Sequence, residues 1–129
     1  NRVAVVTNAG GLGILCADAC EAAGLELPQL NEETVRAIAP LLPGEASLAN
    51  PVDMLGSASA SSYESVLPFL LADPAVDAVI VLFVPAVSAT ADAVADAIAP
   101  VGRAANGEKP VLAVVMSAEG IPAPLRTAH

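Results

Sequence analysis

Three glycines within four positions mark the first stretch of the chain that could bind a ligand. An apolar run ends at Thr7, and Gly10, Gly11 and Gly13 follow just before a helical pattern begins. Glycine lets a ligand approach the main chain closely, and the first N–H groups of a helix have no partner within that helix. Because the helix dipole places partial positive charge there, the turn is suited to an anion. We expect it to bind a phosphoryl group or a carboxylate, and the alternative stays open that its glycines only allow the strand and the helix to pack tightly.

A second candidate stretch contains Asn50, Pro51 and Asp53. The proline ring fixes the backbone, whereas Asn and Asp side chains can cap a helix, turn the chain or bind a ligand. A structural and a functional role therefore both stay open for Asp53.

Other ligand-binding and catalytic patterns fit poorly. The dinucleotide-binding motif G-x-G-x-x-G/A fits its first two glycines to Gly11 and Gly13. Its third position, which should be Gly or Ala, is Cys16, so the match is incomplete. Glu26 follows near the end of a second predicted strand, where an acid could bind a ribose, so NAD binding stays open as an alternative. The sequence has no Walker A lysine, and its single histidine, His129, is the last residue, so no Ser-His-Asp arrangement can be assembled. We expect no catalytic residue in this chain.

The two cysteines, Cys16 and Cys20, lie four residues apart on one predicted helix. Two thiols and a terminal histidine are too few for a typical zinc site. We therefore expect no metal and interpret both cysteines as small apolar core residues.

The elements that must position these residues alternate between strands and helices. Continuous apolar runs predict strands buried on both faces, and stripes of apolar residues between them predict helices. The predicted strands are 2–7, 25–27, 77–84 and 109–116, and the predicted helices are 11–23, a helix capped by Asn31, 61–72 and 88–101. Such alternation predicts a three-layer α/β sandwich, a flavodoxin-like doubly wound parallel sheet. We expect Val3–Val6, Val79–Phe83 and Val111–Val115 to be adjacent central strands.

Loops at the carboxyl ends of such strands form the ligand edge of the sheet. The loops expected there are 8–13, 50–53, 84–88 and 117–120. Both candidate stretches therefore lie at the same edge.

Length and charge limit the possible partners. The chain has 129 residues, 55% of them hydrophobic, which suits one domain spanning 1–129. Fourteen acidic residues against five basic ones give a formal charge of −9, which disfavours nucleic acid and anionic membranes. No apolar run is long enough to span a membrane, and no signal peptide is present, so we expect a cytoplasmic location. The segment after 116 does not complete another βα unit, so we expect a fragment of a longer multidomain chain.

Three segments together resemble a known family. "RVAVVTNAGGLGILCADACEAAGLEL", "LLPGEASLANPVDMLGSASASSYESVLPFLLADPAVDAVIVLFVP" and "KPVLAVVM" are similar to the succinyl-CoA-synthetase-like flavodoxin domain of ADP-forming acyl-CoA synthetases. The resemblance spans residues 2 to about 117, and its pairing of TNAGG with NPVD is fairly specific. It implies a parent enzyme that interconverts acyl-CoA, ADP and phosphate with acid, CoA and ATP through a phosphohistidine. CoA, ADP or ATP, and Mg²⁺ would be the cofactors of that parent.

Matched residue by residue, the resemblance assigns a phosphate- or substrate-binding role to the candidate stretches. Asn8, Ala9, Gly10, Gly11 and Gly13 match the turn that faces the phosphohistidine, and Asn50, Pro51 and Asp53 match the NPVD loop beside it. The chain lacks the phosphohistidine motif, the CoA-binding domain and the ATP-grasp domain, and His129 has no matching context. Because some bacterial relatives of the family carry a fused acetyltransferase domain, the resemblance leaves open a parent protein with that fusion.

Two hypotheses follow for the function. In the first, the chain is part of an ADP-forming ligase whose other domains or subunits supply the CoA-binding site, the phosphohistidine and the ATP-grasp site. Its own ligands are then phosphate or a small carboxylic acid, it binds no cofactor alone, and it is inactive in isolation. In the alternative, it is a non-catalytic module that binds a small anion or responds to acyl-CoA.

Overall fold

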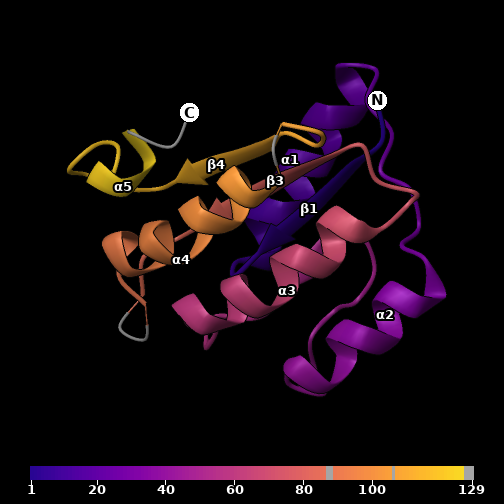
Figure 1. Cartoon of the computed structure of the whole chain (residues 1–129), viewed down its shortest axis with the longest axis horizontal. Helices are drawn as coiled ribbons and strands as arrows, with labels where there is room; N and C mark the ends of the chain where they lie inside the picture. The colour runs from indigo at the N-terminus through magenta and orange to yellow at the C-terminus, as the bar shows by residue number, and fades with distance from the viewer. Residues whose placement is uncertain (87–88, 106, 127–129) are drawn as a thin grey trace.

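Four parallel strands form one sheet in the computed structural model, which describes residues 1–86, 89–105 and 107–126 (Figure 1). The strands are β1 (Val3–Thr7), β2 (Val52–Asp53), β3 (Ala78–Phe83) and β4 (Val111–Val115), in the order β2-β1-β3-β4. The pairs β1–β2, β1–β3 and β3–β4 are all parallel, which confirms the predicted sheet and the adjacency of its three long strands. β4, however, lies at an edge of the described sheet and not in its centre.

Helices cover both faces of the sheet, which confirms the predicted three layers. Figure 1 shows α3 and α4 in front of the sheet and α1 behind it. The larger core cluster joins α2, α3 and α4 to the front face, and a smaller cluster joins α1 to the back. The helices are α1 (Gly10–Ala22), α2 (Glu32–Ile38), α3 (Ala60–Ala72), α4 (Ala91–Ala104) and α5 (Ala123–Arg126), with a short 3₁₀ turn, η1 (Ala39–Leu41).

Side-chain caps fix where two of the helices begin. The Asn31 side chain accepts a 3.0 Å hydrogen bond from the Glu33 N–H, as its predicted N-cap role requires. Thr90 caps α4 by accepting from the Ala93 N–H at 3.2 Å, so this helix begins after the predicted start at Ser88. Ser88 itself lies outside the described residues. None of the helices in the described part of the chain is long and apolar enough to cross a membrane.

The strand predicted at 25–27 is wrong. Only Glu26 forms an isolated bridge there, with Arg2, and the strand beside β1 is β2. The side-chain amide of Asn50 explains the difference, because it occupies this edge of β1: it accepts from the Val5 N–H at 2.9 Å and donates to the Val3 carbonyl at 2.8 Å. Pro28, which has no N–H to donate, then ends the short extended segment.

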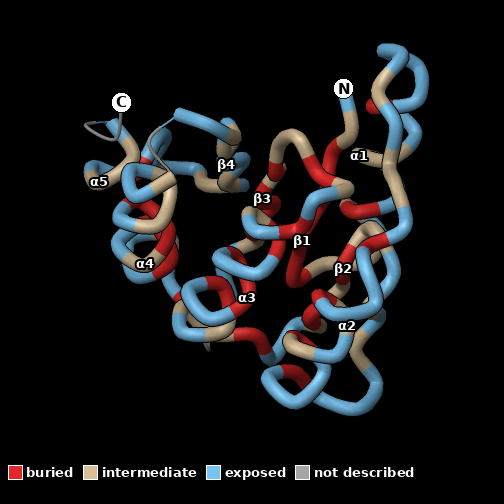
Figure 2. Tube along the Cα trace, turned by 45° about the vertical axis from the view of Figure 1, so that its right-hand side comes forward, coloured by how far each residue is buried: buried red, intermediate tan, exposed pale blue. Residues whose placement is uncertain are grey.

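Burial falls across the sheet from β1 to β4. Every residue of β1 is buried, whereas β4 has no fully buried residue, as the red and pale tubes of Figure 2 show. The candidate site therefore lies beside the best-packed strand.

Candidate functional site

The turn between β1 and α1 presents two free N–H groups at the carboxyl end of β1. The N–H groups of Leu12 and Gly13 bond to the Ala9 carbonyl at 3.0 and 3.1 Å, and the Ala9 N–H bonds to Thr7 Oγ1 at 3.0 Å. The N–H groups of Gly10 and Gly11 have no acceptor among the described residues. Because they belong to the first turn of a 13-residue helix, both carry the positive end of its dipole.

Thr7 and Asn8 hold this turn in place. Thr7 Oγ1 accepts from the Ala9 N–H and also donates to the Ala9 carbonyl at 3.2 Å. The buried Asn8 amide pairs with the backbone of Val84: its Nδ2 donates to the carbonyl at 2.8 Å, and its Oδ1 accepts from the N–H at 3.0 Å. Asn8 therefore links the turn to the end of β3, and its side chain has little capacity left for a ligand.

Asp53 lies at the turn, as its position in the sequence predicts. It pairs in register with Thr7 at the end of β2, and its Oδ1 accepts from the Leu55 N–H at 2.9 Å. A Cβ atom placed on Gly10 would lie only 2.5 Å from Asp53 Oδ2. A side chain at position 10 would therefore displace this carboxylate, which itself lies at the positive end of α1.

Gly13 and Pro51 serve the packing of α1 on the sheet. A Cβ atom on Gly13 would lie 3.1 Å from Thr7 Cγ2 and 3.4 Å from Pro51 Cβ. Asn50 donates a further hydrogen bond to the Pro28 carbonyl at 3.1 Å, so both hydrogens of its amide are used by the backbone. The structure therefore brings Gly10, Gly11 and Asp53 together, and it gives Asn8, Gly13, Asn50 and Pro51 contacts that hold them.

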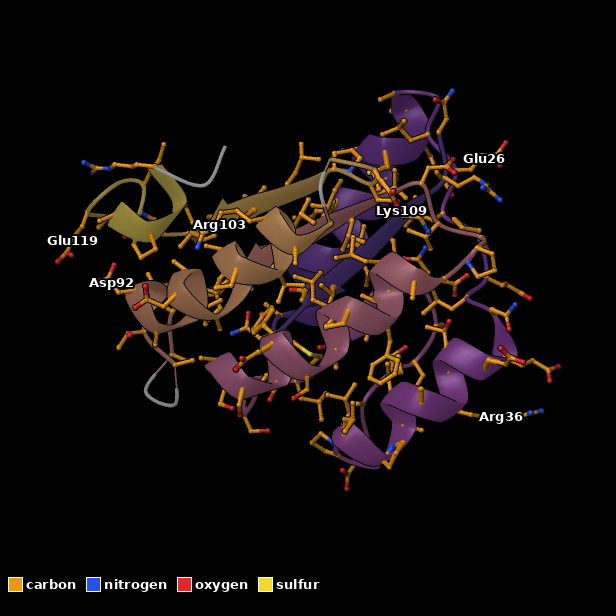
Figure 3. All side chains as sticks on the ribbon, viewed as in Figure 1. Glu26, Arg36, Asp92, Arg103, Lys109 and Glu119 are labelled. Atoms are coloured by element: carbon orange, nitrogen blue, oxygen red, sulfur yellow. The ribbon has the colours of Figure 1, made fainter. Side chains whose placement is uncertain are left out.

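Further carboxylates lie at the same end of the sheet. Asp92 at the start of α4 and Glu119 after β4 both project there in Figure 3. They line a cavity of about 430 Å³ together with Thr90, Ser117 and Arg126. The lining of this cavity includes no residue of the glycine turn, where the N-terminus of α1 is the feature that favours an anion.

Tyr63 is a site-supporting residue that the sequence analysis missed. Its hydroxyl donates to the Leu82 carbonyl at 3.0 Å, and the backbone of Asn8 beside it acts to lower its pKa. Burial, together with the charge of Asp53, raises the pKa of Tyr63 above its usual value. The only signal in the sequence is that this is the single tyrosine of the chain, on the buried face of a predicted helix.

The NAD-binding alternative loses its support here. Glu26 bridges to Arg2 at the amino end of β1, opposite the glycine turn, so it cannot serve as the ribose-binding acid beside that turn (Figure 3). Within the described residues, no group of three His, Cys, Asp or Glu side chains could hold a metal ion.

Cys20 is buried and Cys16 is half-buried against the smaller core cluster, where burial raises the pKa of the Cys16 thiol to about 11. His129 lies outside the described residues.

Comparison with known proteins identifies relatives over nearly the whole chain. The model of the ligase-CoA domain family matches residues 3–122. The alpha subunit of acetate–CoA ligase (ADP-forming) II from Pyrococcus furiosus is 41% identical over 119 residues, which are 91% of this chain and 26% of that subunit. A 4-hydroxybutyrate–CoA ligase (ADP-forming) from Nitrosopumilus maritimus is 30% identical over 87% of this chain and 16% of its own length.

Solved structures agree with these matches. An acetyl-coenzyme A synthetase 1 of Ca. Korarchaeum cryptofilum, solved in complex with phosphate and ADP, superposes with a TM-score of 0.82 at 32% identity. The match covers 88% of this chain and 25% of that one. A protein of Pyrococcus horikoshii OT3 superposes with a TM-score of 0.85 at 38% identity, over 95% of this chain and 31% of its own. The chain thus spans about a third or less of these relatives.

Proposed function

The chain belongs to the ligase-CoA domain family, and from that membership we propose that it works as one domain of an ADP-forming acyl-CoA synthetase. The parent enzyme would interconvert acyl-CoA, ADP and phosphate with a carboxylic acid, CoA and ATP. CoA, the nucleotide and its Mg²⁺ would bind to other domains or subunits, which would also carry the phosphohistidine.

The observation that carries the proposal is the pair of free N–H groups at Gly10 and Gly11. They belong to the first turn of α1, at the edge of the sheet where α/β proteins bind ligands. A phosphoryl group on a histidine of another domain would accept hydrogen bonds from both N–H groups, and the helix dipole would favour its charge. The P. furiosus relative that supports this is named an ADP-forming ligase, and the Korarchaeum relative was solved with phosphate and ADP.

Asp53 gives the alternative its own support. Its carboxylate lies against Gly10, so it repels a dianion at this turn unless a proton or a cation lies between the two. A module that binds a small anion weakly, with no phosphoryl transfer, would tolerate this arrangement. The two hypotheses differ in whether the anion is a covalent phosphohistidine of the same enzyme.

The experiment is phosphoenzyme formation in the intact synthetase that contains this domain. Gly11→Pro removes one of the two free N–H groups at the second residue of α1, where no hydrogen bond within the helix is lost. The ring also disfavours the helical conformation of the preceding Gly10, so the fold of the variant is checked below. The matched control is Gly11→Ala, because a Cβ atom at Gly11 meets nothing within 4 Å. We expect Gly11→Pro to slow phosphorylation from ATP by about 10²-fold or more, the effect of losing one preorganised donor, and Gly11→Ala to change it little.

Two further readouts separate the hypotheses. Circular dichroism shows whether Gly11→Pro remains folded, and CoA affinity should stay at the parental value. If the folded variant phosphorylates at the parental rate, the turn is structural. If the intact protein never becomes phosphorylated yet binds phosphate at this turn, it is the non-catalytic module. The 129-residue chain alone should show no synthetase activity, because no nucleotide site or phosphate carrier is found in its sequence.

A further inference from the structure

A tyrosine hydroxyl lies buried at the point where β1 leaves the sheet. Tyr63 of α3 is fully buried, and its hydroxyl donates to the Leu82 carbonyl of β3 at 3.0 Å. A buried hydroxyl without a partner costs free energy, so this hydrogen bond fixes where the hydroxyl lies. Tyr63 therefore ties α3 to the carboxyl end of β3.

The same carbonyl is the last acceptor of the ladder between β1 and β3. Thr7 pairs in register with Leu82, and the Thr7 carbonyl accepts from the Met54 N–H at 2.9 Å, on the side of β2. Neighbouring residues of a strand bond to opposite sides, so the N–H of the next residue, Asn8, points toward the Leu82 carbonyl. The Asn8 backbone also lies beside the Tyr63 hydroxyl. Three groups from α3, β3 and the start of the glycine turn thus meet at one point.

Contacts on both sides of this point leave the junction little freedom. The Tyr63 ring packs edge-on against Phe83, with ring centroids 5.7 Å apart and an interplanar angle of 89°. The Asn8 amide pairs with both backbone groups of Val84, at 2.8 and 3.0 Å. Among the described residues, no buried side-chain nitrogen or oxygen lacks a hydrogen-bond partner. Residues 82–84 are therefore each held by Tyr63 or by Asn8.

The junction lies directly before the free N–H groups of the turn. Only Ala9 separates Asn8 from Gly10, and the Ala9 N–H is itself held by Thr7 Oγ1 at 3.0 Å. A shift of the Asn8 backbone would therefore move the N–H groups of Gly10 and Gly11. Preorganised donors stabilise charge only where they are aimed at it, and a misplacement of about 1 Å can lower a rate about 10²-fold.

We propose that Tyr63 is a positioning residue for the anion site: its hydroxyl fixes the Asn8 backbone against β3, so that the N–H groups of the turn face the phosphoryl group. This inference rests on the proposed function. Burial raises the pKa of Tyr63, so the hydroxyl stays protonated and acts by hydrogen bonding alone. It does not touch the ligand.

The test compares Tyr63→Phe with Ile98→Val in the intact synthetase. Tyr63→Phe keeps the ring and removes the hydroxyl, whereas Ile98→Val removes one buried methyl group from the same core cluster, in the second half of α4. Both variants should lose a little stability in urea. Only Tyr63→Phe should speed hydrogen exchange of the Asn8 amide, by about 10-fold or more, because that amide loses the contact that holds it.

Two functional readouts accompany the exchange measurement. The affinity for inorganic phosphate should fall about 10-fold in Tyr63→Phe and stay at the parental value in Ile98→Val. Phosphorylation from ATP should slow by about 10-fold or more in Tyr63→Phe alone, with the KM for ATP unchanged, because the nucleotide would bind elsewhere. A tyrosine that serves only packing would not produce this difference.

Two results would overturn the proposal. The first is parental phosphate affinity in folded Tyr63→Phe, whatever the exchange rate of the Asn8 amide. The second is an equal loss of affinity in both variants, which would show a general effect of stability. A parent protein that binds phosphate but is never phosphorylated would refute the phosphoryl-transfer function, and the exchange and affinity measurements would still decide the role of Tyr63. The two failures are therefore distinguishable.

Discussion

Replacing Gly10 with alanine tests directly how the glycine turn and Asp53 fit together. The added Cβ atom would lie 2.5 Å from Asp53 Oδ2, about 0.9 Å closer than the 3.4 Å at which ordinary contact begins. The carboxylate is only half-buried and can move, but its other oxygen accepts the hydrogen bond from the Leu55 N–H, so a movement strains or breaks that bond. Either this hydrogen bond breaks or the start of α1 shifts.

The loss of stability depends on whether the Leu55 hydrogen bond breaks or the start of α1 shifts. Overpacking of a filled site costs about 1–3 kcal/mol, and losing one hydrogen bond costs about 0.5–1.5 kcal/mol. Because the half-buried carboxylate can give way, the cheaper route sets the cost, and we expect Gly10→Ala to lower the free energy of unfolding by about 1 kcal/mol. Gly11→Ala is the matched control: its Cβ atom meets nothing within 4 Å, and alanine is favoured over glycine in a helix by up to about 1 kcal/mol.

Urea unfolding followed by circular dichroism measures both variants. The double variant Gly10→Ala with Asp53→Ala completes a double-mutant cycle, in which removal of the carboxylate should recover most of the Gly10→Ala cost. Equal stabilities for Gly10→Ala and Gly11→Ala, or a coupling energy near zero in the cycle, would refute the close approach of Asp53 to Gly10.

Three further predictions concern residues around the site and in the core. Asn50→Ala should lower the free energy of unfolding, measured by urea titration, by about 3 kcal/mol or more. The substitution leaves three backbone groups, two of β1 and one of Pro28, without their hydrogen-bond partner. A loss below about 1 kcal/mol would show that the Asn50 amide does not stabilise this edge of β1. Burial opposes ionisation of Asp73, but hydrogen bonds from the Ala75 and Asn31 N–H groups outweigh it and lower its pKa below the usual 3.8. Its contribution is therefore present above pH 3.8 and lost as the pH falls further, so Asp73→Asn should flatten the loss of stability between about pH 5 and 3; an unchanged slope would count against it. Because its pKa is raised to about 11, the Cys16 thiol should react with iodoacetamide very slowly at pH 7 and faster as the pH approaches 11. Mass spectrometry measures the labelled fraction, and rapid labelling of the folded chain at pH 7 would disprove this.

The alternating elements could be predicted because each leaves a local signal. The apolar runs at 77–84 and 109–116 predicted β3 and β4, and Asn31 predicted the start of α2. The short strand β2 could not be predicted in the same way. It consists of only two residues, Val52 and Asp53, and it forms only because they pair with β1, which is distant in sequence. The false strand at 25–27 has the same cause: the Asn50 side chain, distant in sequence, occupies the edge of β1.

The candidate site was predictable in part. The glycines indicated an anion-binding turn, and within the described part of the chain the N–H groups of Gly10 and Gly11 have no acceptor. Which of the neighbouring polar residues hold the backbone could not be predicted, because a sequence shows that Asn8 and Asn50 are polar but not that backbone groups already use their amides. Tyr63 was missed for the same reason, since its partners are backbone groups distant in sequence.

We propose that the N–H groups of Gly10 and Gly11 form the anion site of this domain. A titration of the ¹⁵N-labelled 129-residue chain with inorganic phosphate, followed by ¹H–¹⁵N NMR, tests it most directly. We predict saturable shifts of the Gly10 and Gly11 amides, with weaker binding in Gly11→Pro and parental binding in Gly11→Ala. Shifts confined to residues outside 8–13 and 50–53, or equal binding by all three proteins, would contradict the claim.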